Sequence, residues 1–352
     1  MKKIKIAQIG VLHAHGILQL RAVLSLPEIF DFVGVFLDYE TEEEIKKGQQ
    51  NADSVIRSLN GLENNFGPIK KLALDELLNY SDLDAVIIDS FEKDLVKYAL
   101  LAAEKNLHIF MDKPGGESRE DFQRLVNLCE NNKKVFFTGY MYRQNPAVIK
   151  ALDMIKKGEL GKVLCIEAHM DCDHNYETRK WLGNFKGGMT YFLGCHLIDL
   201  IYQIQGKPNR ILPLNTSSGL DGLNSIDYGM VMFEYDTGWS FAKTSAAEFG
   251  GFGRRQLVII GTEASIEIKP FEIIADSKGN IFTDMRIVTR KKDGSNGWRA
   301  VGDTIHFGPF NRYTPMFEEF AKIINNEKEN PYSYEYEKNL FNLIMDCCER
   351  TV

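Results

Sequence analysis

The chain has 352 residues, of which 44% are hydrophobic and 26% are charged, and its formal net charge is −7. This length predicts about two domains with ordinary cores, and the acidic balance argues against a nucleic-acid-binding protein. No run of about 18 apolar residues occurs, so we expect no membrane span. The six cysteines form no Cys-x-x-Cys pair and the N-terminus lacks a signal-peptide pattern, which together favour a cytoplasmic protein with free thiols.

The first third of the chain alternates short apolar runs with helical patterns. The predicted strands are 4–9, 32–37, 85–88, 108–111 and 135–138. The predicted helices are 14–26, 41–60 with Thr41 as N-cap, 75–78, 93–106 and 119–131. Strands and helices that alternate at this spacing predict βαβ units around a parallel sheet.

The pattern changes after about Gly139. Longer predicted strands follow a helix at 145–157, and they are 162–171, 228–235, 239–246, 256–260 and 265–268. The remaining predicted helices are 189–205, 315–325 and 337–349, whereas 276–303 predicts only hairpins and loops. Long strands without intervening helices indicate an antiparallel or mixed sheet.

A glycine turn from Gly10 to Gly16 joins the first strand to the first helix. A dinucleotide pyrophosphate binds at this place, on the helix N-terminus. Leu12 stands where the middle glycine of G-x-G-x-x-G would be, so a plain strand–helix turn is the alternative. Asp38 ends the second strand, where a carboxylate binds ribose hydroxyls and repels a 2′-phosphate. It favours NAD over NADP, with a simple turn aspartate as the alternative.

Two short segments carry candidate catalytic groups. Lys113 follows a predicted strand and precedes Pro114, which biases it to an extended backbone and aims it at the crevice of a parallel sheet. His196 and Asp199 lie three residues apart and share one helix face, so the carboxylate could orient the imidazole. A solvated surface lysine and a structural histidine are the alternatives.

Metal-ligand residue types are dense in two places. They are His13, His15, His169, Asp171, Asp173 and His174. No spacing matches a known metal motif, and we do not expect His13 and His15 to converge on one ion. The sequence therefore predicts no metal site.

Several segments, taken in order, resemble the Gfo/Idh/MocA family of oxidoreductases along nearly the whole chain. They are Ile9-Gly10 with its helix, 84–88, 108–114 (similar to the family's H-V-x-x-E-K-P), 142–147, 158–163, 187–199 and 261–266. The resemblance implies a Rossmann dinucleotide-binding domain at 1–139 and an α/β substrate-binding and oligomerisation domain at 140–352. The second domain would contain a large, mostly antiparallel sheet, and we expect a homodimer or homotetramer through that sheet.

The resemblance also implies roles for single residues. Lys113 would contact both nicotinamide and substrate, and His196 would lie near the reacting hydroxyl. The expected cofactor-binding residues are Gly10, Leu12, His13, Gly16, Asp38, Ser90, Asp112 and Lys113. The expected substrate-binding residues are Lys113, Arg143, His174, Trp181 and His196, with Tyr140, Tyr176 and Arg179 as further candidates for the pocket wall.

Two positions depart from the family pattern. Phe192 stands where the family's catalytic aspartate lies, and Ser90 begins a segment that replaces the family's T-P-N-x-x-H. Because phenylalanine cannot take a proton, Asp199, His174 or Asp173 would have to complete the proton relay with His196 and Lys113.

The sequence therefore favours an NAD(P)-dependent oxidoreductase that transfers hydride between nicotinamide and a sugar, cyclitol or related polyol derivative. We expect neither a nucleic-acid nor a membrane partner. One alternative is a lyase or glycosidase in which bound NAD oxidises the substrate transiently. The other is a ligand sensor that binds a dinucleotide but catalyses no reaction.

Overall fold

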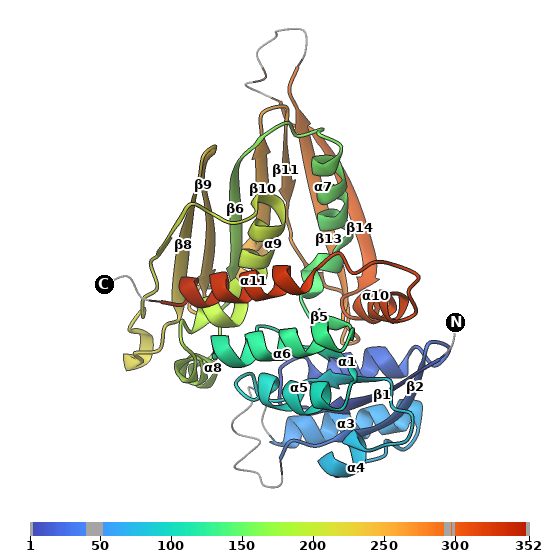
Figure 1. Ribbon diagram of the computed structural model, residues 1–352. Coiled ribbons are helices and arrows are strands. Elements are labelled where there is room, and N and C mark those ends of the chain that lie inside the picture. The colour runs from blue at the N-terminus through green and yellow to red at the C-terminus, as the bar shows by residue number, and fades with distance from the viewer. Residues whose placement is uncertain (1–2, 40–51, 292–296, 298–299, 350–352) are drawn as a thin grey trace. The chain divides into compact units, whose positions relative to one another are not determined.

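The computed structural model describes residues 3–39, 52–291, 297 and 300–349, drawn in colour in Figure 1. The chain divides into two compact units. The first contains Met1–Tyr140 and Tyr313–Asn342, and the second contains Met141–Arg312 and Leu343–Val352. Within the described ranges, no helix is long and apolar enough to cross a membrane. The N-cap predicted at Thr41 lies outside these ranges.

The first unit is built on a five-stranded sheet in the order β2-β1-β3-β4-β5. Its strands are β1 (Ile4–Ile9), β2 (Phe30–Phe36), β3 (Ala85–Ile88), β4 (His108–Met111) and β5 (Phe136–Thr138). Every pairing between neighbours is parallel, which confirms the predicted parallel sheet. All four residues of β3 are buried, as expected for a continuous apolar run at the centre of such a sheet.

Helices cover both faces of this sheet. They are α1 (Gly16–Leu24), α3 (Ala52–Phe66), α4 (Leu74–Leu78), α5 (Leu95–Glu104), α6 (Arg119–Asn131), α10 (Thr314–Ile324) and the first part of α11 (Tyr334–Cys347). Because side chains alternate along a strand, Phe136 packs on Phe122 of α6 and Phe137 on Phe320 of α10. Helix α10 therefore completes the core of a sheet that lies far from it in sequence.

The second unit contains a nine-stranded sheet in the order β12-β13-β11-β10-β6-β9-β8-β7, with β14 paired to β13. The strands are β6 (Val163–Asp171), β7 (Arg210–Pro213), β8 (Tyr228–Tyr235), β9 (Gly238–Ser245), β10 (Gln256–Gly261), β11 (Ala264–Ile268), β12 (Ile273–Ile274), β13 (Asn280–Thr289) and β14 (Asp303–Asn311). Only β6 and β9 pair in parallel, so the sheet is mixed and mostly antiparallel, as predicted.

Three helices of this unit position the residues of interest. They are α7 (Pro146–Lys156), α8 (Tyr176–Trp181) and α9 (Cys195–Gln205). Figure 1 shows α7 and α9 on one face of the sheet, and α9 contacts β6 and β9. A π-helical turn over Thr190–Gly194 leads into α9. Gly188 precedes this turn with φ +48°, and a Cβ there would lie 2.0 Å from the carbonyl oxygen of Ile226, so only glycine fits.

Candidate active site

The glycine turn between β1 and α1 is held closely against the end of β3. Gly10 has φ +90°, and a Cβ at this position would lie 2.6 Å from the backbone of Ser90. The side-chain amide of Gln8 donates to the carbonyl oxygens of Gly10 and Gly16, at 2.9 and 3.0 Å. Gln8 therefore fixes both ends of the turn, a role that the sequence alone did not reveal because the residue lies inside a strand.

The carboxylate of Asp38 lies against this turn. It accepts hydrogen bonds from the backbone amides of Val11, at 2.9 Å, and Phe91, at 3.3 Å. Burial raises the pKa of Asp38 to about 6, although these hydrogen bonds oppose the shift. Asp38 is therefore ionised at neutral pH and is placed at the carboxyl end of β2, as predicted.

Several features of the turn fit a dinucleotide. Helix α1 begins at Gly16 with no side-chain cap among the described residues, so its N-terminal dipole favours an anion. The hydroxyl of Ser90 is buried and has no hydrogen-bond partner in the described part of the chain. A ribose, phosphate or carboxamide group of a dinucleotide would supply one.

Leu12 occupies the middle-glycine position without filling the crevice. Its side chain is buried in an apolar cluster with residues of α3 that include Val55 and Leu59. The side chain of Leu12 therefore contributes to the core of the first unit.

Lys113 and Asp112 directly follow β4. The side chain of Lys113 is fully buried. Asp112 accepts the Lys113 amide on Oδ1 at 2.6 Å, and the Nδ1 atoms of His13 and His15 both lie 3.0 Å from Oδ2. Both histidine rings therefore meet at one carboxylate, a contact that the sequence did not predict. Gly16 starts a helical turn directly after the short H-x-H segment, and this turn brings both rings onto one carboxylate.

Two further buried carboxyl groups, Asp89 and Glu92, were missed at the sequence level. Burial, together with the charge of Asp112, raises the pKa of Asp89 well above its ordinary value. Burial also raises the pKa of Glu92, whereas the charges of His13 and Lys113 oppose it. Asp89 follows β3 just as Asp38 follows β2 and Asp112 follows β4. The rule that ligands bind at the carboxyl ends of parallel strands could have identified Asp89.

His196 and Asp199 lie on α9 in the second unit, and both are buried. The Arg143 guanidinium donates to both carboxylate oxygens of Asp199, at 2.7 to 3.1 Å, and Gln203 donates to Oδ2 at 2.8 Å. The ring of Tyr142 stands edge-on to His196, with centroids 5.0 Å apart. Asp199 is therefore bound by Arg143 and Gln203, and Arg143 serves as its counter-ion.

Aromatic residues surround the position where the family's acid would stand. Phe192 is buried, and the centroid of its ring lies 5.2 Å from that of Trp181 and 6.4 Å from that of His174. Burial and the charge of Arg255 lower the pKa of His174 to about 4, so its imidazole is neutral at pH 7. Arg179 donates to the carbonyl oxygen of His174 at 3.1 Å. The structure thus brings together His174, Trp181 and Phe192, whereas Tyr176 is exposed.

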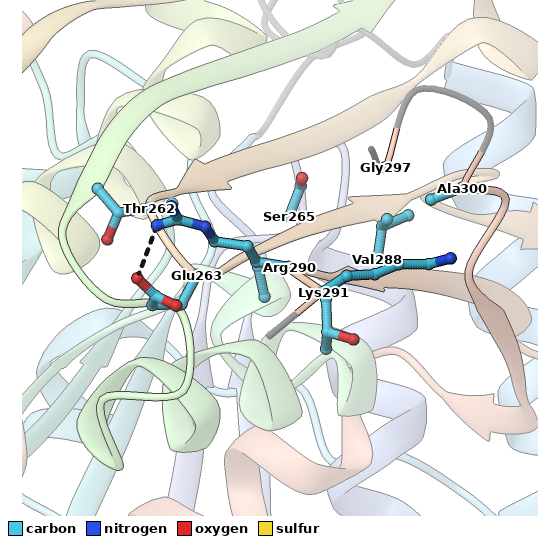
Figure 2. A pocket seen from close by; sticks show the side chains of 11 residues that line it. Thr262, Glu263, Ser265, Val288, Arg290, Lys291, Gly297 and Ala300 are labelled. Carbon is cyan, nitrogen blue, oxygen red and sulfur yellow. Dashed lines mark hydrogen bonds and ion pairs between the residues drawn. The ribbon is translucent and has the colours of Figure 1, made fainter. Parts of the chain in front are cut away.

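Figure 2 shows a separate hollow in the second unit, with a volume of about 370 Å³. Thr262, Glu263, Arg290 and Lys291 contribute to its wall, and Arg290 pairs with Glu263 at 3.4 Å. None of the predicted site residues lines this hollow.

Two family models match the chain. Residues 32–140 match "Oxidoreductase family, NAD-binding Rossmann fold", and residues 148–267 match "GFO/IDH/MocA C-terminal domain". The chain belongs to the Gfo/Idh/MocA oxidoreductases. Membership in this family confirms the resemblance, and the two matched segments account for a nucleotide-binding Rossmann sheet followed by a mostly antiparallel sheet.

Relatives of known name are distant from this chain in sequence. D-xylose 1-dehydrogenase (NADP(+)) 2 of Haloferax volcanii is 22% identical over 74% of this chain and 79% of its own length. 2,7-anhydro-N-acetylneuraminate hydratase of Mediterraneibacter gnavus is 27% identical over 39% of this chain and 38% of its own. UDP-N-acetylglucosamine 3-dehydrogenase of Acidithiobacillus ferrooxidans has the same fold, with a TM-score of 0.73, 15% identity and coverage of 99% of this chain and 97% of that one.

Proposed function

We propose that this chain is an NAD(P)-dependent dehydrogenase that acts on a secondary alcohol of a sugar, cyclitol or related polyol derivative. The observation that carries the proposal is the fully buried Lys113 at the carboxyl end of β4, beside the buried acid Asp112. A lysine is rarely buried completely unless charged or polar partners hold it there. Two of the named relatives are sugar or sugar-nucleotide dehydrogenases, which agrees with this substrate class.

The cofactor would be held by Gly10, Gly16, Asp38, Ser90 and the residues that follow β4. When bound, nicotinamide would accept the hydride of the alcohol carbon. Asp38 is ionised at neutral pH and would bind the ribose hydroxyls of NAD better than a 2′-phosphate. We therefore propose NAD as the preferred cofactor, although the H. volcanii relative is named for NADP(+).

In this proposal His196 takes the hydroxyl proton, and Lys113 binds the same substrate oxygen. General acid–base assistance of this kind contributes roughly 10²- to 10⁴-fold to a rate. Asp199 and Arg143 would act as positioning residues, because their bidentate pair fixes α9 against the turn that carries Tyr142. His174 and Trp181 would contact the substrate, whereas the guanidinium of Arg143, expected from the sequence to do so, is bound to Asp199.

The experiment is a screen of polyols and sugars with NAD and with NADP, followed by Lys113→Ala on any substrate that is found. We expect Lys113→Ala to lose turnover by at least about 100-fold, with a smaller loss of dinucleotide affinity because the other proposed cofactor-binding residues remain. Full activity in this variant would overturn the assignment. Lys113→Arg is the matched variant, because it keeps the positive charge but changes its geometry.

A second candidate is a reaction in which bound NAD oxidises the substrate only transiently, followed by elimination. Phe192 at the place of the family's acid and the hydratase among the relatives favour it. Product that forms without net accumulation of NADH would support this candidate over the dehydrogenase. Dinucleotide binding without turnover on the whole panel would instead favour a sensor.

We also propose that the chain forms a homodimer or homotetramer through the sheet of the second unit. Large apolar side chains on three of its strands are more than a third exposed on one face: Leu212, Trp239 and Phe282. A sheet face of this kind is typical of a protein–protein contact. Light scattering of the wild type and of Trp239→Glu measures the mass directly, and a monomeric wild type would contradict the proposal.

A further inference from the structure

Three side chains of the types that bind metal ions, His13, His15 and Asp112, meet in one buried cluster. The ligand-type atoms of these three residues lie within 4.8 Å of one another, and His13 and Asp112 are fully buried. A metal ion with bonds of about 2.0 to 2.2 Å holds two of its ligand atoms about 3.0 Å apart at a right angle and about 3.4 Å apart at the tetrahedral angle. The two Nδ1–Oδ2 distances of 3.0 Å match the first of these spacings.

The tautomer of His13 follows from its neighbours. Its Nε2 atom lies 3.1 Å from the carbonyl oxygen of Lys113, and because a carbonyl can only accept, Nε2 carries a proton. The amide of His15 donates to His13 Nδ1 at 3.2 Å, so Nδ1 accepts. His13 Nδ1 thus lies close to both the His15 amide and the Asp112 carboxylate, and a metal ion bound there would replace the His15 amide as the partner of Nδ1. The contact from Nε2 to a carbonyl is also how metal-binding histidines are commonly oriented.

Gln19 supplies an independent observation. Its side chain is fully buried, its Nε2 contacts Asp112 Oδ2, and its Oε1 has no hydrogen-bond partner among the described residues. The oxygen and nitrogen of a glutamine amide are assigned from their surroundings. Rotation of this amide by half a turn would direct a fourth ligand oxygen into the cluster, where a bound cation would separate it from Asp112 Oδ2, and would turn the amide nitrogen to the present place of Oε1.

The surrounding charge also favours a cation. Asp89 and Glu92 are fully buried beside this cluster, and Glu92 Oε1 lies 3.7 Å from His13 Nε2. Three carboxyl groups, those of Asp89, Glu92 and Asp112, and one lysine, Lys113, are thus fully buried in this part of the first unit. Buried charges in proteins are usually paired or bind metals.

We propose that His13, His15 and Asp112 bind a divalent transition-metal ion such as Zn²⁺, with Gln19 Oε1 as the fourth donor. Two imidazole nitrogens and carboxylate or amide oxygens suit Zn²⁺, Fe²⁺, Co²⁺ and Mn²⁺. Among the ligand side chains, His15 is the one with solvent exposure, at 13%, so the ion enters on its side. The proposal does not rest on the proposed dehydrogenase activity, because the ligands are present whether or not a dinucleotide binds.

The test uses the full chain, stripped with a chelator, reloaded with Zn²⁺, desalted and analysed for metal. We expect the wild type to retain about one Zn²⁺ per chain, and His15→Gln to bind it at least about tenfold more weakly. Glutamine keeps an N–H donor for Asp112, so a role in hydrogen bonding alone would survive this substitution. His306→Gln is the matched control, because His306 forms a surface pair with Asp284 at 2.8 Å.

Co²⁺ gives a second readout that needs no enzymatic activity. We expect a visible absorption spectrum of bound Co²⁺ in the wild type and in His306→Gln, and its loss in His15→Gln. Thermal unfolding without metal checks that His15→Gln is folded. A wild type that retains no Zn²⁺, or equal Zn²⁺ affinity in the wild type and His15→Gln, would overturn the proposal.

Discussion

Arg143 donates to both carboxylate oxygens of Asp199, with both side chains about 1% exposed. Removing one partner leaves a buried charge without compensation, which typically costs about 3 to 5 kcal/mol. We therefore expect Arg143→Met to lower the free energy of unfolding by this amount, measured in urea. The double variant Arg143→Met/Asp199→Leu should recover part of the loss, since neither charge remains. Asp153→Asn, which breaks the exposed pair with Lys157, should change stability by less than about 1 kcal/mol.

Gly10 and Gly67 provide a matched pair for testing the glycine turn. Both have φ +90°, but a Cβ at Gly10 would meet the backbone of Ser90 at 2.6 Å, whereas nothing lies within 4 Å at Gly67. Gly67→Ala should cost about 1 to 2 kcal/mol, the strain of a left-handed backbone. Gly10→Ala should cost more and should also weaken dinucleotide binding, because the turn must move away from β3. Equal losses of stability in the two variants would show that the close approach is unimportant.

The raised pKa of Asp38 predicts a pH dependence of stability. Its pKa is about 6 in the folded protein and ordinarily 3.8, so the folded state binds this proton more tightly than the unfolded state does. Ionisation of Asp38 therefore lowers the free energy of unfolding as the pH rises from about 4 to about 6, by at most about 3 kcal/mol. Asp38→Asn lacks this contribution.

The free energy of unfolding of Asp38→Asn minus that of the wild type should thus increase with pH across this window. Urea titrations of both proteins at several pH values measure the difference. The comparison isolates Asp38 from other titrating groups. His174, for example, has a lowered pKa, so its contribution to the free energy of unfolding increases with pH instead of decreasing. A difference that stays constant with pH would mean that Asp38 has an ordinary pKa.

Substitution of His196 should reduce catalysis without reducing cofactor binding. If His196 takes the hydroxyl proton, His196→Gln should lower kcat by roughly 10²- to 10⁴-fold. Dinucleotide affinity, measured by fluorescence or calorimetry, should not change, because the proposed cofactor residues belong to the first unit. His169→Gln is a suitable control, since His169 is a partly buried histidine of the second unit and lies on β6. Retention of kcat in His196→Gln would exclude it as the base.

The amino-acid sequence determined the class of fold and most of the element positions. Buried strands appear in the sequence as continuous apolar runs, and half-buried strands and helices appear as apolar residues with periods of 2 and 3.6. These patterns follow from local backbone geometry. The strands 85–88, 108–111 and 228–235 and the helix 119–131 were therefore predicted with the observed bounds. Strand β14 was missed because it is largely exposed and has no apolar stripe. The same local reasoning placed Asp38, Asp112 and Lys113 at strand ends, where a parallel sheet offers its ligand site.

Only the tertiary structure decided which side chains meet. The pairing of Arg143 with Asp199 joins residues 56 positions apart, and Asp112 lies 97 positions from His15. Packing also placed Asp89 and Glu92 in a buried cluster and grouped Tyr313–Asn342 with the first unit. Local propensity carries no information about such contacts, because burial and electrostatic pairing depend on how distant segments pack.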